Sequence, residues 1–223
     1  MKHLICALFI ISIVSLTGCQ SGRDETKTNP EEMNEKDLPD VRAFEDEFTR
    51  SFLQSTEETK TGYYPFVSGT GTYKMDFPAG GVIGEKGYGI DKNNFEGYLV
   101  GVATGEALDS SINFEYYSYK KEKFSDSGLE TLKQQFNAKI TFEKVPFDNH
   151  MLFLAPIENG DGVFGYVAFL QNTLKSGAIS IIYESECTAD EKACKGVKNK
   201  EKDDIVNWLE SIEFIENEID ENK

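Results

Sequence analysis

Cysteine is the residue type in this chain whose spacing points most directly to chemistry. Four cysteines occur among the 223 residues. Cys187 and Cys194 lie in CTADEKAC, and a disulfide between them would close a loop of eight residues and add about 2.5 kcal/mol of stability. A metal or redox pair is the alternative, but the spacing is not C-x-x-C and no histidine is near. We predict a structural disulfide, formed in a compartment where thiols are oxidised.

Cys19 follows a segment that is typical of an export signal. Lys2 and His3 form a short polar start, and the 13 residues from Leu4 to Leu16 are apolar except for two serines. This run is too short to cross about 30 Å of hydrocarbon as a helix, and it has the length of the apolar core of a signal peptide.

The residues Leu16-Thr17-Gly18-Cys19 resemble the lipobox of bacterial lipoproteins. The resemblance implies that residues 1–18 are removed and that Cys19, which becomes the N-terminus, carries a diacylglyceryl group with chains such as palmitate. Two acyl chains anchor firmly, because each buried methylene contributes about 0.8 kcal/mol. The protein would then lie on the extracytoplasmic face of the cell membrane. An ordinary signal peptide with a coincidental cysteine is the alternative.

Side chains that could catalyse a reaction show no recognised arrangement. His150 is the only histidine after the signal, it neighbours Asp148, and the chain has no G-x-S-x-G motif. The 39 acidic residues offer too many carboxylate pairs for spacing to select a glycosidase pair. We therefore assign no catalytic residue and do not expect an enzyme, and a cell-envelope hydrolase using carboxylates is the alternative.

Two loops suggest ligand binding, but neither has the full pattern. Residues 79–89, AGGVIGEKGYG, lack the order of a phosphate-binding loop and a following helix, so we expect a flexible loop. Residues 91–97, DKNNFEG, begin like a calcium loop, but Phe95 and Glu96 occupy the places of a ligand and of the turn glycine. We predict no metal site and no cofactor, and a calcium site of another kind is left open.

Tyr117 and Tyr119 form the candidate binding surface. They lie in INFEYYSY at 112–119, a predicted strand with apolar or aromatic side chains on both faces. Ordinary packing on both faces is the simpler interpretation. If the two tyrosines are exposed, they would suit a protein or a glycan.

The net charge of −16 argues against nucleic acid as a partner, because a nucleic-acid binder needs a basic stripe and none is visible. Residues 20–40 contain almost no apolar side chains and are rich in charge and turn formers. We expect them to form a disordered tether with a reach of about 25 Å.

Hydrophobic periodicity predicts an α+β fold, with a largely antiparallel sheet of six to eight strands and about three helices in a single domain. We expect a signal peptide at 1–18, a lipidated cysteine and acidic tether at 19–40, a globular domain at 41–216 and a solvated tail at 217–223. The predicted helices are 40–54, 127–137 and 203–213. The predicted strands are 63–68, 71–77, 95–103, 111–119, 139–147, 150–157, 163–171 and 177–185.

The order of these elements, between YKMDFPAGG at 73–81 and IVNWLESIEF at 205–214, resembles the PsbP-like α+β domains. That resemblance implies a non-catalytic adaptor or assembly role and transfers no functional residue.

The sequence therefore predicts a membrane-anchored lipoprotein that works as a binding or adaptor module with a protein partner. The alternatives are the hydrolase and an immunity or exclusion lipoprotein, for which acidity is the only support.

Overall fold

The computed structural model describes residues 29–103, 108–119, 125–136, 140–158, 163–188 and 191–215. Its main element is an eight-stranded, wholly antiparallel sheet in the order β3-β5-β6-β10-β9-β8-β7, with β4 also pairing with β5. This confirms the predicted fold class. The strands are β3 (Gly81–Ile83), β4 (Gly89–Asp91), β5 (Phe95–Ala103), β6 (Leu108–Tyr117), β7 (Glu143–Pro146), β8 (His150–Glu158), β9 (Val163–Asn172) and β10 (Ala178–Cys187).

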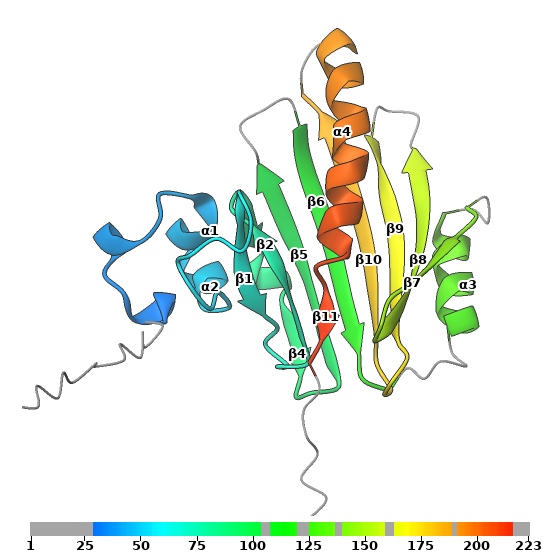
Figure 1. Ribbon diagram of the computed structural model, residues 1–223, viewed down its shortest axis with the longest axis horizontal. Coiled ribbons are helices and arrows are strands. Elements are labelled where there is room, and N and C mark those ends of the chain that lie inside the picture. The colour runs from blue at the N-terminus through cyan, green and yellow to red at the C-terminus, as the bar shows by residue number, and fades with distance from the viewer. Residues whose placement is uncertain are drawn as a thin grey trace, which may run out of the picture.

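A second sheet is also antiparallel and has three strands in the order β1-β2-β11. This small sheet and the helices pack against the large sheet. Figure 1 shows α4 lying along the large sheet, α1 and α2 beside β1, and α3 beside β7 and β8. The second sheet holds β1 (Tyr63–Val67), β2 (Tyr73–Pro78) and β11 (Glu213–Phe214). The α-helices are α1 (Arg42–Glu45), α2 (Glu47–Arg50), α3 (Ser125–Gln135) and α4 (Glu191–Leu209), and the 3-10 turns are Pro30–Glu32, Glu35–Asp37 and Glu85–Gly87.

The main core lies between the large sheet, the small sheet and α4. Every second side chain of β5 and β6 points into it, because successive residues of a strand face opposite sides. Aromatic rings fill its centre: Phe114 stacks on Tyr73 at 5.2 Å and on Tyr98 at 5.1 Å between ring centroids. The hydroxyls of these two tyrosines are hydrogen-bonded at 3.1 Å. The centre of the core is therefore aromatic, and the two tyrosine hydroxyls within it satisfy each other.

A smaller core lies on the other face of the sheet, under α3. Leu132 of α3 is buried against Val167 and Phe169 of β9, and Gly128 leaves room for the Phe169 ring, which a Cβ would approach to 2.7 Å. Strands β8 and β9 are thus covered on both faces, as their apolar sequences predict. The same expectation for β5 is wrong, because Leu99 on its outer face is 50% exposed.

Glu96 is a fully buried carboxylate that fixes the turn between β1 and β2. One of its oxygens accepts the backbone N–H of Gly69 and the hydroxyl of Tyr88, both at 2.9 Å. The other accepts the hydroxyl of Thr70 at 3.1 Å. A buried carboxylate needs such donors, since burial without hydrogen bonds is costly. Glu96, which occupies the place of the turn glycine in the calcium-loop pattern at 91–97, is therefore a buried structural residue.

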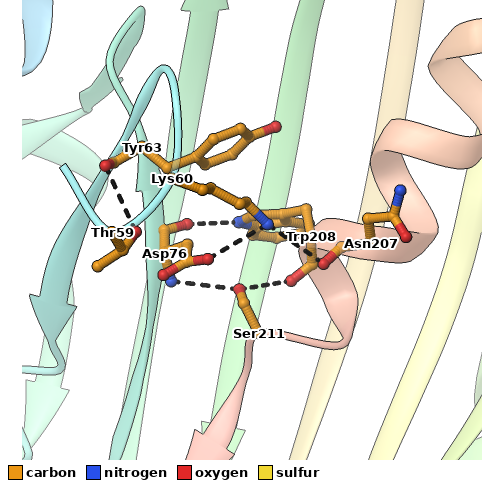
Figure 2. A network of polar contacts seen from close by, with 7 residues as sticks. All are labelled: Thr59, Lys60, Tyr63, Asp76, Asn207, Trp208 and Ser211. Carbon is orange, nitrogen blue, oxygen red and sulfur yellow. Dashed lines mark hydrogen bonds and ion pairs between the residues drawn. The ribbon is translucent and has the colours of Figure 1, made fainter.

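Helix α4 is fixed to the small sheet by a network of polar contacts (Figure 2). The indole N–H of Trp208 donates to the carbonyl of Asp76 at 2.9 Å. The hydroxyl of Ser211 accepts the Asp76 N–H at 3.2 Å and donates to the carbonyl of Trp208 at 2.6 Å. Lys60 forms an ion pair with the Asp76 carboxylate at 3.2 Å. The C-terminal end of α4 is thereby held at one position along β2.

All three predicted helices have other bounds in the structure. The helix expected at 40–54 is divided at Asp46, whose carboxylate accepts the Thr49 N–H at 2.8 Å and so begins α2 as a new helix. The helix expected at 203–213 is α4, which begins at Glu191 and ends at Leu209, so Asp203 and Asp204 lie within it rather than in its first turn. Helix α3 begins at Ser125, so Ser127 and Glu130 do not form the expected capping box.

Residues 79–89, expected to be a flexible loop, contain β3 and the start of β4 and pair with the edge of β5. Residues 29–38 of the predicted tether form two 3-10 turns, and Pro30 is buried. Residues 19–28 of the predicted tether, including Cys19, lie outside the described residues, as do the predicted signal peptide at 1–18 and the predicted tail at 217–223.

We predict that Trp208→Phe lowers the free energy of unfolding by about 1–3 kcal/mol, because the partly buried Asp76 carbonyl loses its donor. Urea unfolding followed by circular dichroism measures the change. The matched control is Lys74→Gln, which removes an ion pair to Glu213 whose two side chains are each 53% exposed, and which should cost no more than about 1 kcal/mol. Equal losses in the two variants would contradict this account of α4.

We also predict that protonation of His150 destabilises the fold. Its ring is 2% exposed and stacks on Phe147 at 4.6 Å, and Nε2 has no hydrogen-bond partner in the described part of the chain. Burial lowers the pKa of this imidazole below 6.5. Its contribution is therefore complete above about pH 6.5 and is lost as the pH falls below that value, because the unfolded chain binds the proton more readily.

Urea unfolding between pH 7 and pH 5 tests this expectation. The free energy of unfolding of the wild type should fall more steeply with decreasing pH than that of His150→Gln. Parallel curves for the two proteins would show that His150 does not contribute.

Candidate functional site

The outer face of β5, β6 and β10 is an open surface beside α3. The register aligns outward residues in rows, such as Leu99 beside Asn113 and Asn113 beside Ile182. On β5 and β6 these outward positions are exposed or half-buried, while the alternate positions on β5 are buried. Helix α3 packs on β9 and reaches only the near edge of this surface. We call the outward side of these three strands the open face.

Aromatic side chains gather at one end of the open face. The rings of Phe95 and Tyr117, which are paired across the strands, lie 5.2 Å apart, and Tyr119 lies 5.6 Å from Tyr117. Tyr119 is 62% exposed and Tyr117 is half-buried. The structure therefore brings the two predicted tyrosines together and adds Phe95 and Leu99, which the sequence analysis did not assign to the surface.

The open face is also acidic. Glu115 accepts the hydroxyl of Tyr117 at 2.8 Å, and burial together with this carboxylate raises the pKa of that phenol. Asp109, Glu184 and Glu186 occupy further outward positions. Strands β5, β6 and β10 contain no lysine or arginine. Lys120, Lys121 and Lys123 follow in the sequence and lie outside the described residues.

A shallow hollow of about 140 Å³ lies where the open face meets α3. Glu115, Tyr117 and Ser180 of the sheet line it on one side, and Thr131 and Gln135 of α3 line it on the other. The hollow is too small for a drug-sized ligand, since such sites usually occupy 300–1,000 Å³. It suits a single side chain of a partner.

A larger cavity of about 550 Å³ lies on the opposite side of the sheet, against α4. Glu201 and Asp204 line it and are three residues apart on one helix, so they lie on one wall. Glycoside hydrolysis requires two carboxylates that flank the bond to be cleaved. This cavity therefore gives no support to the hydrolase alternative.

Cys187 and Cys194 are joined in a disulfide, with their Cα atoms 5.8 Å apart. Cys187 is the last residue of β10, and Cys194 lies in the first turns of α4 rather than in a loop before it. The bond therefore ties the sheet to the start of α4.

His150 faces the core, away from the open face.

Within the described ranges, no group of three or more histidine, cysteine, aspartate or glutamate side chains is placed to hold a metal ion. None of the helices among those residues has both the length and the apolar character required to cross a membrane.

The chain matches a family described as "Putative lipoprotein YvcA" over residues 39–213. A relative of the same name from Bacillus subtilis (strain 168) is 24% identical over 238 aligned positions, which cover 96% of this chain and 98% of the relative. No solved structure matches. The resemblance to PsbP-like domains is not tested by these matches and stays a prediction. Because the family match covers most of the folded part, the chain belongs to the YvcA family of lipoproteins.

Proposed function

We propose that this protein is a non-catalytic binding module, held on the extracytoplasmic face of the cell membrane by lipid on Cys19. Membership of a lipoprotein family and the Leu16-Thr17-Gly18-Cys19 sequence support the anchor. The observation that carries the binding role is the open face. A sheet face with an exposed leucine and clustered aromatic rings is typical of an interaction site.

The chemistry of the open face selects the kind of partner. Aromatic side chains are enriched in protein interfaces, and Phe95, Tyr117, Tyr119 and Leu99 supply an apolar centre. Four carboxylates on strands without any lysine or arginine favour a basic surface on the partner. A second copy of this chain is disfavoured, because each copy has a net charge of −16.

The partner that fits is thus a protein of the cell envelope with an apolar patch ringed by lysine or arginine. An immunity role, with a basic toxin as partner, is a special case of this proposal and needs no further feature of the structure.

We predict that Cys19→Ala abolishes incorporation of labelled palmitate into the protein, because the thiol is the attachment point. The matched control is Cys6→Ala, which changes a cysteine of the signal peptide and should leave labelling unchanged. Labelling of Cys19→Ala at the wild-type level would contradict the anchor.

We predict that Leu99→Lys removes the partner, since it replaces an exposed leucine of the open face with a positive charge, which a basic partner surface repels. The full-length protein is purified from membranes in mild detergent, and co-purifying proteins are quantified by mass spectrometry. The partner should be a protein with a basic surface that is recovered at a constant ratio with the wild type and at least tenfold less with Leu99→Lys.

The matched control is Leu174→Lys, which adds the same charge at a leucine that is 59% exposed in the turn between β9 and β10. It should retain the partner. Equal recovery with both variants would show that the open face is not the docking site, and recovery of no stoichiometric partner would contradict the binding role.

A further inference from the structure

The cavity against α4 contains the carboxylate of Glu201, which forms no ion pair with any lysine or arginine in the described part of the chain. One oxygen of Glu201 accepts three neutral donors, the hydroxyls of Ser185 at 3.1 Å, Tyr183 at 3.3 Å and Ser110 at 3.4 Å. No described lysine or arginine forms an ion pair with it. The neighbouring Lys200 pairs instead with Asp204 at 3.3 Å. Glu201 is therefore held in place by hydroxyls, while its charge has no cationic partner in the described part of the chain.

Aromatic side chains form the walls around this carboxylate. Trp208 and Tyr183 lie 5.7 Å apart, edge to face, and Tyr63 lines the cavity from the start of β1. Burial and the nearby carboxylates of Asp204 and Glu201 raise the pKa of Tyr63 to about 12. The Tyr63 hydroxyl thus lies in a negative field, at a site where its own ionisation is unfavourable.

The surroundings of Tyr63 already bind one ammonium group. The amino group of Lys60 lies 4.6 Å from the centre of the Tyr63 ring, 3.2 Å from the Asp76 carboxylate and 3.4 Å from the carbonyl of Asn207 (Figure 2). An aromatic ring and a carboxylate together form a typical site for an organic cation. Lys60 does not line the cavity, so it leaves Glu201 available.

We propose that this cavity binds a compact organic cation, with its ammonium group at Glu201 and its body against Tyr63, Tyr183 and Trp208. The volume of about 550 Å³ is within the range of small-molecule sites. Arg42 and Lys200 also line the cavity, but Arg42 donates to the carbonyl of Gly80 at 3.2 Å and Lys200 pairs with Asp204 at 3.3 Å, so neither forms an ion pair with Glu201. A neutral or anionic ligand would leave the charge of Glu201 uncompensated. This site lies on the opposite side of the sheet from the open face and does not depend on the proposed function.

The experiment uses the fluorescence of Trp208, the only tryptophan of the chain, as a reporter in the cavity. The full-length protein in neutral detergent is titrated with cyclohexylammonium, with cyclohexanol as the isosteric neutral probe and with cyclohexanecarboxylate as the anion. We expect a saturable change with the ammonium compound, and binding at least about tenfold weaker with the other two.

Glu201→Gln keeps an acceptor for the three hydroxyls and removes the charge, so it should weaken binding of cyclohexylammonium at least about tenfold. The matched control is Asp203→Asn, an exposed position on the same helix outside the cavity, which should leave the affinity unchanged.

Three results would overturn the proposal: no saturable change with cyclohexylammonium, equal affinity for cyclohexanol, or equal affinity of Glu201→Gln and Asp203→Asn for the ammonium probe. If Glu201→Gln does not fold, the selectivity of the wild type between the ammonium compound and the alcohol decides the matter alone.

Discussion

The unequal covering of the eight-stranded sheet is the constraint on which the rest of the structure depends. Its inner face is covered by aromatic side chains from both sheets and by α4. Its outer face is covered by α3 over β8, β9 and the adjoining part of β10, where apolar side chains of β9 point both ways. The outward residues of β5 and β6 therefore remain exposed, and their chemistry, aromatic and acidic, is what the protein presents to a partner.

The disulfide and the polar contacts at Trp208 act on the two ends of the same helix. Cys194 ties the start of α4 to the end of β10, and Trp208 ties its end to β2. With both ends fixed, the side chains in the middle of α4, including Glu201, are held at a set position over β6 and β10. A long helix fixed in this way can form a wall of a cavity without collapsing onto the sheet.

Much of the fold could be predicted from the sequence, because strands such as β8 and β9 have strong apolar patterns and clear turns. The short strands β3, β4 and β11 could not, since they have two or three residues and depend on pairing with a neighbour. The start of α4 was missed because residues 191–202 are polar and contain Gly196, and the helix there is held by the disulfide. Asp46 looks like an interior helix position, but its side chain begins a new helix.

The candidate surface was predicted only in part. Tyr117 and Tyr119 stood out as aromatic residues in one strand, but Leu99 looked like core because β5 reads as apolar on both faces. Only the position of α3 shows that the outer face of β5 is uncovered, and no pattern within β5 contains that information. The cavity at Glu201 brings together residues far apart in the sequence, so spacing alone could not find it.

Site-specific photocrosslinking in intact cells is the most direct test of the open face as a docking surface. A photoreactive phenylalanine analogue is placed at Leu99, and in a separate strain at Leu174, in the otherwise unchanged lipoprotein. We expect one discrete crosslinked protein with a basic surface from position 99 and none from position 174. The same products from both positions, or none from position 99, would contradict the account.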